Sequence, residues 1–434
     1  MNIAVLGGGV EGSAIEKYFS ERNNHVQIFD NFKDEDIKNF NLDSFDMVFR
    51  SPSVHPLDKS WNTMTKYFFD HCPAKIIGVT GTKGKGTTCS IITSILKEII
   101  KNSENKNREV YLVGNIGNPC INELDKIKSD DIVVFEMSSF QLWDLTKSPN
   151  VAVVLRVEQD HLDRHFSLED YHNAKANITR HQTAEDCCIF YNNNENSKRI
   201  GNLSLGKKFS YPIERTKNVT AVLDELQVPG EHNAENAEAA LLAVAGLLNQ
   251  SLEQLLSNEE ILESIKAGVR NFKGLPHRIE FVRELNGVRY YDDNFSASYP
   301  ATDVAIKTFE KDPTILIAGG KDRHLDLTDY KKRLSTAKSL KKVLLIGEIK
   351  NILAENEDPE KFELFDSLEE AVNRAKEIAE KIADDTSQNY DLCIPVTKPA
   401  HPVVLMSPGA ASFDMFKNFK DRGEQFQNIV KALK

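Results

Sequence analysis

The chain has 434 residues, of which 40% are hydrophobic and 27% charged, and its formal net charge is −11. This composition is typical of a soluble globular protein of about two to four domains, and the acidic balance without a long basic stripe argues against nucleic acid and anionic membranes as partners. Six cysteines occur without a CxxC pair, which disfavours a zinc site and favours a reduced, intracellular protein.

The first segment reads as strand, glycine turn, helix and strand. "NIAVL" at 2–6 precedes the turn of Gly7, Gly9 and Gly12, and "HVQIFD" ends at Asp30. These glycines fit GxGxxG, in which a phosphate approaches backbone N–H groups at a helix N-terminus. The pattern suggests a dinucleotide site, and a tight turn without a ligand is the alternative. The segment lacks the basic start of a signal peptide, and no apolar run in the chain reaches the length of a membrane span.

A second phosphate-binding pattern follows the apolar strand "KIIGVT" at 75–80. The loop "GTKGKGTT" contains Gly81, Gly84 and Lys85, and a helix of apolar spacing comes next. Backbone N–H groups of such a loop face phosphates, and the lysine reaches the terminal ones. The usual Mg²⁺-binding hydroxyl after the lysine is replaced by Gly86, so we expect Thr87 to supply it. A glycine-rich turn with a surface lysine is the alternative.

Polar residues follow the next buried strands. "DIVVFEMSS" places Glu136 at a strand end, as an Mg²⁺ ligand or as a hydrogen-bonded cap. "VAVVLRV" leads into "EQDHLDRH", where His161 is a candidate metal ligand and a polar surface turn is the alternative. Lys175 lies on the following predicted helix, and from spacing alone it reads as part of a solvated face. Alternating strands and helices predict a parallel sheet with its ligands at the carboxyl ends of the strands.

The helix that follows begins with "GEHNAENA". His232, Asn233 and Asn236 lie near its start, and the two asparagines share a face. They suit hydrogen bonds to adenine or phosphate, and helix capping by Asn233 is the alternative. "NFKGLPHR" then reads as a linker, after which "VRYYDD", "TILIAGG", "KVLLIG" and "HPVVLMSP" predict another α/β module.

The order of these motifs resembles that of the Mur ligases. "VTGTKGKGTT", "EMSSFQL", "DHLDRH", "GEHNAENA", "LPHR", "GGKDRH" and "SPGAASFDMFKNFKDRGEQF" occur in the family's order over essentially the whole chain. The resemblance implies an α/β protein of three domains. They are a small Rossmann-like domain (1–73) that binds UDP rather than NAD, a central P-loop-type mononucleotide-binding domain (74–275), and a Rossmann-like C-terminal domain (276–434) that binds the amino acid.

The resemblance also assigns residues to sites. It implies an ATP site formed by Gly81, Thr82, Lys83, Gly84, Lys85, Gly86, Thr87, Asn233, Asn236, Arg278 and Asp293, with His232 beside them. It implies a UDP-sugar site formed by Gly9, Val10, Glu11, Gly12, Asp30, Asn115, Ser138 and Gln141. The metal ligands are Thr87, Glu136, His161 and Lys175, the last as a carbamate, and the catalytic set is Lys85, Glu136, His161 and Lys175. Arg323, Ser412 and Phe419 would face the amino acid.

The implied reaction is ATP-dependent amide formation in peptidoglycan precursor synthesis, with two Mg²⁺ sites. The closest resemblance is to members that add D-glutamate to UDP-N-acetylmuramoyl-L-alanine through an acyl phosphate, and it implies a cytoplasmic monomer. Three positions depart from the family pattern. Gly86 replaces a hydroxyl residue, Arg156 stands where Asn is frequent, and Phe295 replaces a lysine associated with the amino acid. We therefore expect Arg323 to contact the side-chain carboxylate alone, through a bidentate fork.

Two other functions remain open from the sequence. The first is a related ligase that adds a different amino acid or uses a folate-like acceptor, against which the N-terminal glycine turn and "GNIG" favour a UDP-sugar. The second is a non-catalytic UDP-sugar-binding protein. Gly86 and Phe295 support that function, and the presence of Lys85, Glu136, His161 and Lys175 opposes it.

Overall fold

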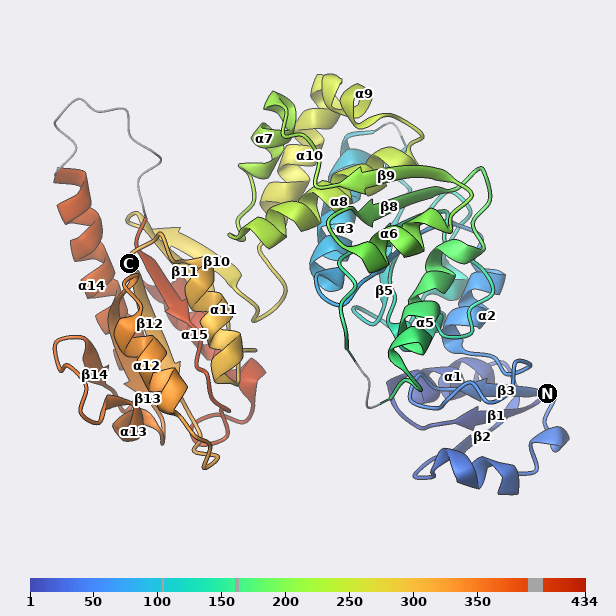
Figure 1. The fold of residues 1–434 in the computed structure, drawn as a ribbon, viewed down its shortest axis with the longest axis horizontal. Coiled ribbons are helices and arrows are strands. Elements are labelled where there is room, and N and C mark those ends of the chain that lie inside the picture. Colours follow the sequence, from blue (N-terminus) through green and yellow to red (C-terminus); the bar gives the residue numbers. More distant parts are fainter. Residues whose placement is uncertain (104, 161–163, 389–400) are drawn as a thin grey trace. The chain divides into compact units, whose positions relative to one another are not determined.

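The computed structural model describes residues 1–103, 105–160, 164–388 and 401–434 (Figure 1). The chain forms two compact units. Unit 1 comprises Met1–Leu226 and Glu231–Phe272, and unit 2 comprises Gln227–Gly230 and Lys273–Lys434. Two sheets lie in unit 1 and one in unit 2, and most strand pairs are parallel, which confirms the predicted α/β class.

The first sheet of unit 1 has three parallel strands in the order β2-β1-β3. Their bounds are β1 (Asn2–Leu6), β2 (His25–Phe29) and β3 (Met47–Arg50). Helix α1 (Val10–Ser20) starts directly after the glycine turn and buries Ile15 and Phe19 against the apolar residues of β1. The expected strand–turn–helix–strand order is therefore present at the N-terminus.

The second sheet of unit 1 has six parallel strands in the order β5-β6-β4-β7-β8-β9. Its strands are β4 (Lys75–Thr80), β5 (Val110–Gly114), β6 (Ile132–Glu136), β7 (Val151–Val154), β8 (Cys187–Tyr191) and β9 (Lys207–Tyr211). Strands β6 and β7 are buried along their whole length, as expected for near-continuous apolar runs covered on both faces. Because β4 lies between β6 and β7, the loops that follow these three strands open at one edge of the sheet.

Helices cover this sheet on both sides, and α3 packs against α8 and α10 (Figure 1). The remaining helices of unit 1 are α2 (Met64–His71), α3 (Lys85–Asn102), α4 (Ser139–Leu142), α5 (Leu168–Arg180), α6 (Glu195–Asn202), α7 (Lys217–Leu223), α8 (Glu231–Leu247), α9 (Leu252–Ser257) and α10 (Glu259–Asn271). Short 3₁₀ turns occur at Asp34–Asn39, Leu42–Ser44, Cys120–Asn122 and Leu124–Lys126.

A buried ion pair joins the two sheets of unit 1. The Arg50 side chain, at the end of β3, is fully buried and forms a fork with Asp144, with N–O distances of 2.6 and 3.0 Å. The same guanidinium donates to the Val54 carbonyl at 3.0 Å and to the Phe140 carbonyl at 3.4 Å. The N-terminal sheet is thus fastened to the segment after β6.

Unit 2 contains a six-stranded sheet in the order β10-β11-β15-β12-β13-β14, parallel except for β10. Its strands are β10 (Glu280–Leu285), β11 (Val288–Asp292), β12 (Thr314–Gly319), β13 (Leu340–Ile346), β14 (Phe362–Leu364) and β15 (Val403–Met406). Its helices are α11 (Tyr299–Thr308), α12 (Thr328–Thr336), α13 (Lys350–Ala354), α14 (Leu368–Gln388) and α15 (Phe419–Ala432). Separate apolar clusters fill the two faces of the sheet.

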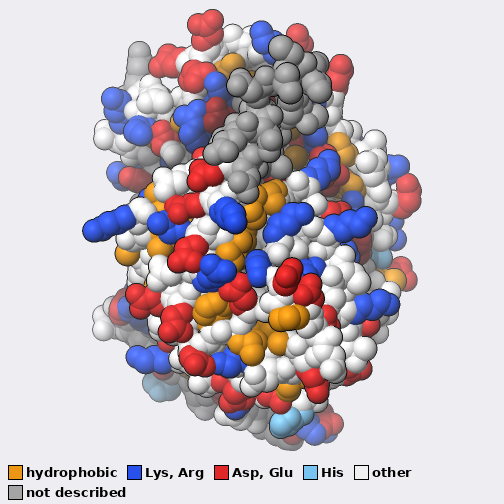
Figure 2. Space-filling model, turned by 90° about the vertical axis from the view of Figure 1, so that its left-hand side faces the viewer, with side chains coloured by type: hydrophobic (Ala, Val, Ile, Leu, Met, Phe, Trp, Pro, Cys, Tyr) orange, Lys and Arg blue, Asp and Glu red, His pale blue; other side chains and the backbone are white. Residues whose placement is uncertain are grey.

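Charges of both signs are interspersed on the face of the molecule in Figure 2, rather than gathered into a basic stripe. None of the helices in the described ranges is long and apolar enough to cross a membrane. The main segment of unit 2 begins at Lys273, within the linker expected from the sequence. The division between residues 73 and 74 stays a prediction, because the residues on both sides of it lie in unit 1.

Candidate active site

The loop after β4 has the backbone geometry of a phosphate cradle. Gly81 and Gly84 have φ of 154° and 85°, and Gly84 is the N-cap of α3. A Cβ on Gly84 would lie 2.5 Å from the Asn236 side-chain oxygen, so another residue would displace that side chain and would also be strained at this φ. The loop places the N-terminus of a long helix at the edge of the sheet, where backbone N–H groups attract anions.

Two lysines converge on this loop. Lys85 Nζ donates to the carbonyl oxygens of Gly81 and Thr82 at 3.0 and 3.1 Å, and Lys175 Nζ donates to the Gly81 carbonyl at 3.0 Å. Lys175 also lies 3.4 Å from Thr80 Oγ1 and is only 2% exposed. The solvated-face interpretation of Lys175 is therefore wrong. The residue lies on the apolar stripe of α5, which also buries Tyr171.

Burial and the neighbouring charge of Lys85 hold the pKa of Lys175 well below its ordinary value, although Asp160 and Glu136 oppose the shift. A neutral amine is the form that reacts with an electrophile such as carbon dioxide. Lys175 thus meets the first chemical requirement for carbamate formation, beside the loop expected to hold phosphates.

Carboxylate and amide groups complete this edge of the sheet. Glu136, the last residue of β6, is 6% exposed and accepts a hydrogen bond from Asn115 Nδ2 at 3.0 Å. A buried carboxylate requires a donor or a cation, and a carboxylate beside an amide oxygen suits Mg²⁺. Glu136 fits such an ion by donor type, as a carbamate on Lys175 would.

A cavity of about 230 Å³ opens beside these residues. It brings together eight residues assigned from the sequence, namely Glu11, Gly81, Thr82, Lys85, Asn115, Ser138, Gln141 and Lys175. Its wall also includes Asp160 and Tyr171. Since the set spans both sheets of unit 1, the two predicted binding regions share one cavity.

The N-terminal glycine turn contributes Glu11 to this cavity. Gln141 Nε2 donates to Glu11 Oε1 at 2.9 Å, while Glu11 Oε2 is buried with no hydrogen-bond partner among the described residues. Burial raises the Glu11 pKa. The turn itself is tight, because a Cβ on Gly12 would lie 2.0 Å from the Gly7 carbonyl oxygen. Glu11 thus brings a buried carboxyl group to the wall of the cavity.

Not every predicted ligand can be placed. His161 lies outside the described residues. Thr87 is the third residue of α3 and half-buried, and the next hydroxyl, Thr88 Oγ1, is buried without a partner among the described residues. Asn233 and Asn236 are 8% and 9% exposed. Asn233 lies inside the first turn of α8, so the capping interpretation is wrong.

Arg278 and Asp293, the other predicted ATP contacts, lie in unit 2. The Arg278 guanidinium stacks 3.8 Å above the ring of Phe295, which is 47% exposed. Asp293 is buried, accepts a hydrogen bond from Ser407 Oγ at 2.6 Å, and has its pKa raised to about 7, mainly by burial. Phe295 therefore orients the predicted nucleotide-binding arginine.

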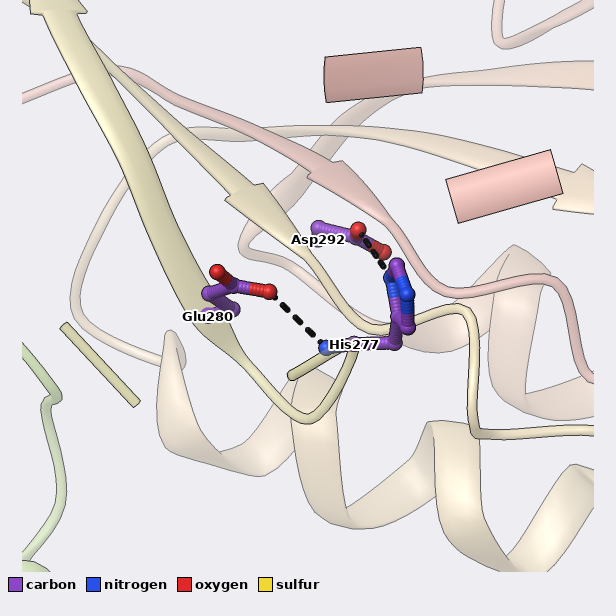
Figure 3. Close-up of side chains that lie close together, drawn as sticks. All are labelled: His277, Glu280 and Asp292. Carbon is purple, nitrogen blue, oxygen red and sulfur yellow. Dashed lines mark hydrogen bonds and ion pairs between the residues drawn. The ribbon is translucent and has the colours of Figure 1, made fainter. Parts of the chain in front are cut away.

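The turn that holds Arg278 is anchored by a hydrogen-bonded clamp (Figure 3). His277 Nδ1 pairs with Asp292 at 2.7 Å, and the His277 backbone N–H donates to Glu280 at 2.9 Å. Gln427 Nε2 donates to both carboxylates at 2.9 Å, so the group is closed by hydrogen bonds. The clamp holds His277 at φ 59° and Ile279 at φ 46°, conformations that cost free energy in non-glycine residues.

The predicted amino-acid residues lie on two neighbouring segments of unit 2. A β-bridge joins Lys321 to Ala411, next to the buried Ser412. Arg323 is exposed two residues beyond Lys321. Phe419 begins α15 and contacts Phe295 edge to face, with ring centroids 5.4 Å apart. The arrangement is compatible with the sequence assignment, which stays a prediction.

Sequence reasoning missed two features of unit 1. Arg50, which fastens the N-terminal sheet, gives no periodic signal. Ser139 and His165 both occur inside quoted motifs, and the structure joins them by a hydrogen bond of 2.9 Å at the cavity wall. The motif order alone does not say which strand ends meet.

Comparisons with known proteins agree with this geometry. Residues 79–244 match the Mur ligase middle domain. UDP-N-acetylmuramoylalanine–D-glutamate ligases from Acetivibrio thermocellus and Clostridium tetani are 32% and 30% identical to the chain, each over 99% of it and 96% of the relative. Among solved structures, a UDP-N-acetylmuramoyl-L-alanyl-D-glutamate–2,6-diaminopimelate ligase superposes with a TM-score of 0.58 at 15% identity, covering 99% of this chain and 92% of that one.

The fold likeness extends to MurC from Thermotoga maritima, with a TM-score of 0.54 at 16% identity and full coverage of both chains. The sequence identity over nearly whole chains and the matched central domain agree with the phosphate loop and the two lysines beside it. The chain belongs to the Mur ligase family of ATP-dependent amide-forming ligases in peptidoglycan synthesis.

Proposed function

We propose that the chain is the ligase that adds D-glutamate to UDP-N-acetylmuramoyl-L-alanine in the cytoplasm, as a monomer, during cell wall biogenesis. The names of the relatives that match it over nearly their whole length support the choice of substrates. The observation that carries the reaction is the convergence of Lys85 and buried Lys175 on the Gly81 carbonyl, at the rim of a cavity shared by both sheets of unit 1.

The acceptor occupies that cavity in this proposal. The UDP group lies over the glycine turn, near Gly9, Val10, Gly12 and Asp30, and the sugar extends past Glu11, Ser138 and Gln141 toward Asn115. Its terminal carboxylate then reaches Lys85 and Lys175. Glu11 and Gln141 both line this cavity and are joined by a hydrogen bond of 2.9 Å, and these polar side chains support a ligand rich in hydroxyl and amide groups.

ATP binds with its phosphates on the loop 81–87, and Asn233 and Asn236 contact the nucleotide from α8. Lys85 stabilises the charge that develops as the γ-phosphoryl group moves to the acceptor carboxylate. The resulting acyl phosphate has a good leaving group, which an unactivated carboxylate lacks. The amine of D-glutamate then forms the C–N bond, loses a proton, and phosphate departs.

Two Mg²⁺ ions belong to the proposal, because the donor set fits them. Glu136, the Thr87 hydroxyl, His161 and carbamylated Lys175 would hold them, and the ions supply positive charge that neutralises the phosphates. Lys175 must be neutral to capture carbon dioxide, and its depressed pKa supports that role.

The amino acid is assigned to unit 2. Arg323 contacts the side-chain carboxylate of D-glutamate, and Ser412 and Phe419 lie near its other groups. Phe295 cannot bind a carboxylate as the lysine of other family members does. Arg323 therefore carries that contact alone, and Arg323→Ala should raise the KM for D-glutamate strongly with less effect on ATP.

The experiment is acceptor-dependent phosphate release from ATP. UDP-N-acetylmuramoyl-L-alanine is supplied with D-glutamate, L-glutamate, meso-diaminopimelate, L-lysine or L-alanine in separate reactions. We expect D-glutamate to be preferred. Preference for a neutral or basic amino acid would contradict the substrate assignment and leave a related ligase. Absence of turnover with every amine, together with UDP-sugar binding, would favour the non-catalytic protein.

A further inference from the structure

The imidazole of His165 is locked against the wall of the cavity in unit 1. Its side chain is fully buried, stacked on Phe140 with ring centroids 4.9 Å apart and packed on Trp143 at 4.3 Å. A ring enclosed in this way keeps one orientation, so its two nitrogens face fixed partners. His165 therefore acts as a rigid connector between two hydrogen-bonding groups.

One of these partners is a carboxylate. His165 Nδ1 lies 2.9 Å from Asp170 Oδ2. Asp170 also accepts hydrogen bonds from Trp143 Nε1 at 2.9 Å and from the Phe166 backbone N–H at 3.2 Å. An ionised carboxylate can only accept, so Nδ1 carries a proton. In the neutral imidazole the other nitrogen, Nε2, is then an acceptor.

The second partner is the hydroxyl of Ser139, the first residue of α4. Ser139 Oγ lies 2.9 Å from His165 Nε2 and is bonded to no other group in the described ranges. Since Nε2 accepts, the hydroxyl proton points toward the imidazole. Ser139 is 2% exposed, and its residue lines the cavity beside Ser138 and Gln141. Because its proton is already used, Ser139 Oγ can only accept a hydrogen bond from a ligand, through its lone pairs.

We propose that Ser139 Oγ accepts a hydrogen bond from an amide N–H of the acceptor substrate, and that His165, fixed by Asp170, is the positioning residue that keeps Ser139 an acceptor. This inference rests on the proposed function. The acceptor has two amides, the N-acetyl group and the link from the muramoyl group to L-alanine. An amide N–H can only donate, so it requires a fixed acceptor, whereas a sugar hydroxyl adapts to either partner.

The test is a thermodynamic cycle that combines a substitution in the protein with a substitution in the acceptor substrate. Two acceptor analogues each replace one N–H by oxygen. The first has L-lactate in place of L-alanine, and the second has an O-acetyl group in place of the N-acetyl group. With the unaltered protein, the analogue that lacks the contacted N–H should lose about tenfold to a hundredfold in kcat/KM. With Ser139→Ala that discrimination should vanish, while the KM for ATP stays unchanged. The analogue affected identifies the amide.

Variants of His165 test the positioning role. His165→Leu should lose the same discrimination as Ser139→Ala. His165→Gln should restore part of it, because its amide oxygen can accept from Ser139. The matched control is His172→Leu, since His172 is a buried histidine on α5 that does not line the cavity. This control should retain the full discrimination.

The outcomes separate the inference from the proposed function. If the unaltered protein releases no phosphate in response to the acceptor, the proposed function is wrong. The role of Ser139 can still be decided in that case, by measuring acceptor binding calorimetrically for the same proteins and analogues. Undiminished discrimination against both analogues in Ser139→Ala would overturn the inference. Labelling of Ser139 by a fluorophosphonate would also overturn it, because it would identify the serine as a nucleophile rather than a hydrogen-bond acceptor.

Discussion

Replacing Lys175 by methionine should change how the stability of unit 1 depends on pH. The amine is 2% exposed and its pKa is held well below its ordinary value, first by burial and then by the charge of Lys85. Methionine has a similar length and carries no proton. Lys175→Met therefore removes the titration of this group while leaving most of the packing volume in place.

The sign and size of the effect follow from proton linkage. Between the lowered folded-state pKa and the unfolded-state pKa of about 10.4, Lys175 is neutral when folded and protonated when unfolded. Unfolding then binds one proton, so the free energy of unfolding falls by about 1.4 kcal/mol for each pH unit below 10.4 within that window. Lys175→Met lacks this loss. Its stability relative to the unaltered protein should rise with the same slope as the pH is lowered from about 10, until the folded-state pKa of Lys175 is reached.

Urea unfolding in carbon dioxide-free buffer measures this difference. Both tryptophans of the chain, Trp61 and Trp143, lie in unit 1, so their fluorescence reports the unfolding of the unit that contains Lys175. Lys97→Met, at an exposed position on α3, is the control and should leave the slope unchanged. Parallel stability curves for the unaltered protein and Lys175→Met would refute the reasoning, because Lys175 would then be protonated in the folded state.

Three further outcomes are expected. Thr87→Ala should lower turnover by about a hundredfold through loss of a metal-binding hydroxyl, whereas Thr88→Ala should have little effect on steady-state phosphate release. Arg50→Met should lower the free energy of unfolding of unit 1 by about 3 kcal/mol, the lower end for a buried pair, measured by tryptophan fluorescence, because it leaves the Asp144 carboxylate, which is 13% exposed, without its partner. The His277 pKa is raised mainly by the hydrogen bond to Asp292, so the hydrogen-exchange protection factors in residues 273–388 and 401–434, corrected for the intrinsic exchange rate at each pH, should fall as pH rises above about 6.5.

Each of these outcomes has a contrary result. Equal, small effects of the two threonine changes would show that neither hydroxyl binds metal. An Arg50→Met protein as stable as the unaltered one would mean that the fork does not hold the two sheets together. Asp292, the carboxylate of the clamp, adds a second pH dependence. Burial raises the Asp292 pKa, but the hydrogen bonds it accepts outweigh burial and hold the pKa below its ordinary value. The stability that Asp292 contributes is therefore lost as pH falls below about 4. His277→Gln should flatten the dependence above pH 6.5, and an unchanged dependence would contradict the linkage.

Apolar runs and glycine turns correctly predicted the strands of the catalytic region. A strand that is buried on both faces is a nearly continuous apolar run, and such a run has few alternative structural interpretations. β4, β6 and β7 all occur where their runs are found. The hairpin of β10 and β11 was not predicted, although "NG" at 286–287 is a strong hairpin signal and both residues have positive φ. An alternating strand beside an interdomain linker is easily read as part of the linker.

The site was predicted less completely than the fold, for a physical reason. Spacing gives a residue's place on its own element, but not which elements meet. Lys175 reads as a surface lysine until α5 is packed on the sheet, and its neighbours Tyr171 and Ile178 show that it shares their buried stripe. The hydrogen bond between Ser139 and His165 depends in the same way on segments that meet only in three dimensions.

The shared carbonyl of Gly81 has a consequence for how ligands influence one another. The charge of Lys85 opposes protonation of the Lys175 amine beside it, so any ligand that changes the charge near one lysine changes the proton affinity of the other. Metal-free nucleotide brings negative charge, favours the protonated form of Lys175, and should oppose carbon dioxide. Magnesium nucleotide should reverse the sign, because the proposed carbamate of Lys175 would be an oxygen donor for the cation. By thermodynamic reciprocity, raising the carbon dioxide concentration should weaken the binding of metal-free nucleotide and strengthen the binding of its magnesium complex. Each factor equals the one by which that form of the nucleotide changes carbon dioxide affinity, so carbon dioxide and nucleotide are allosteric effectors of one another.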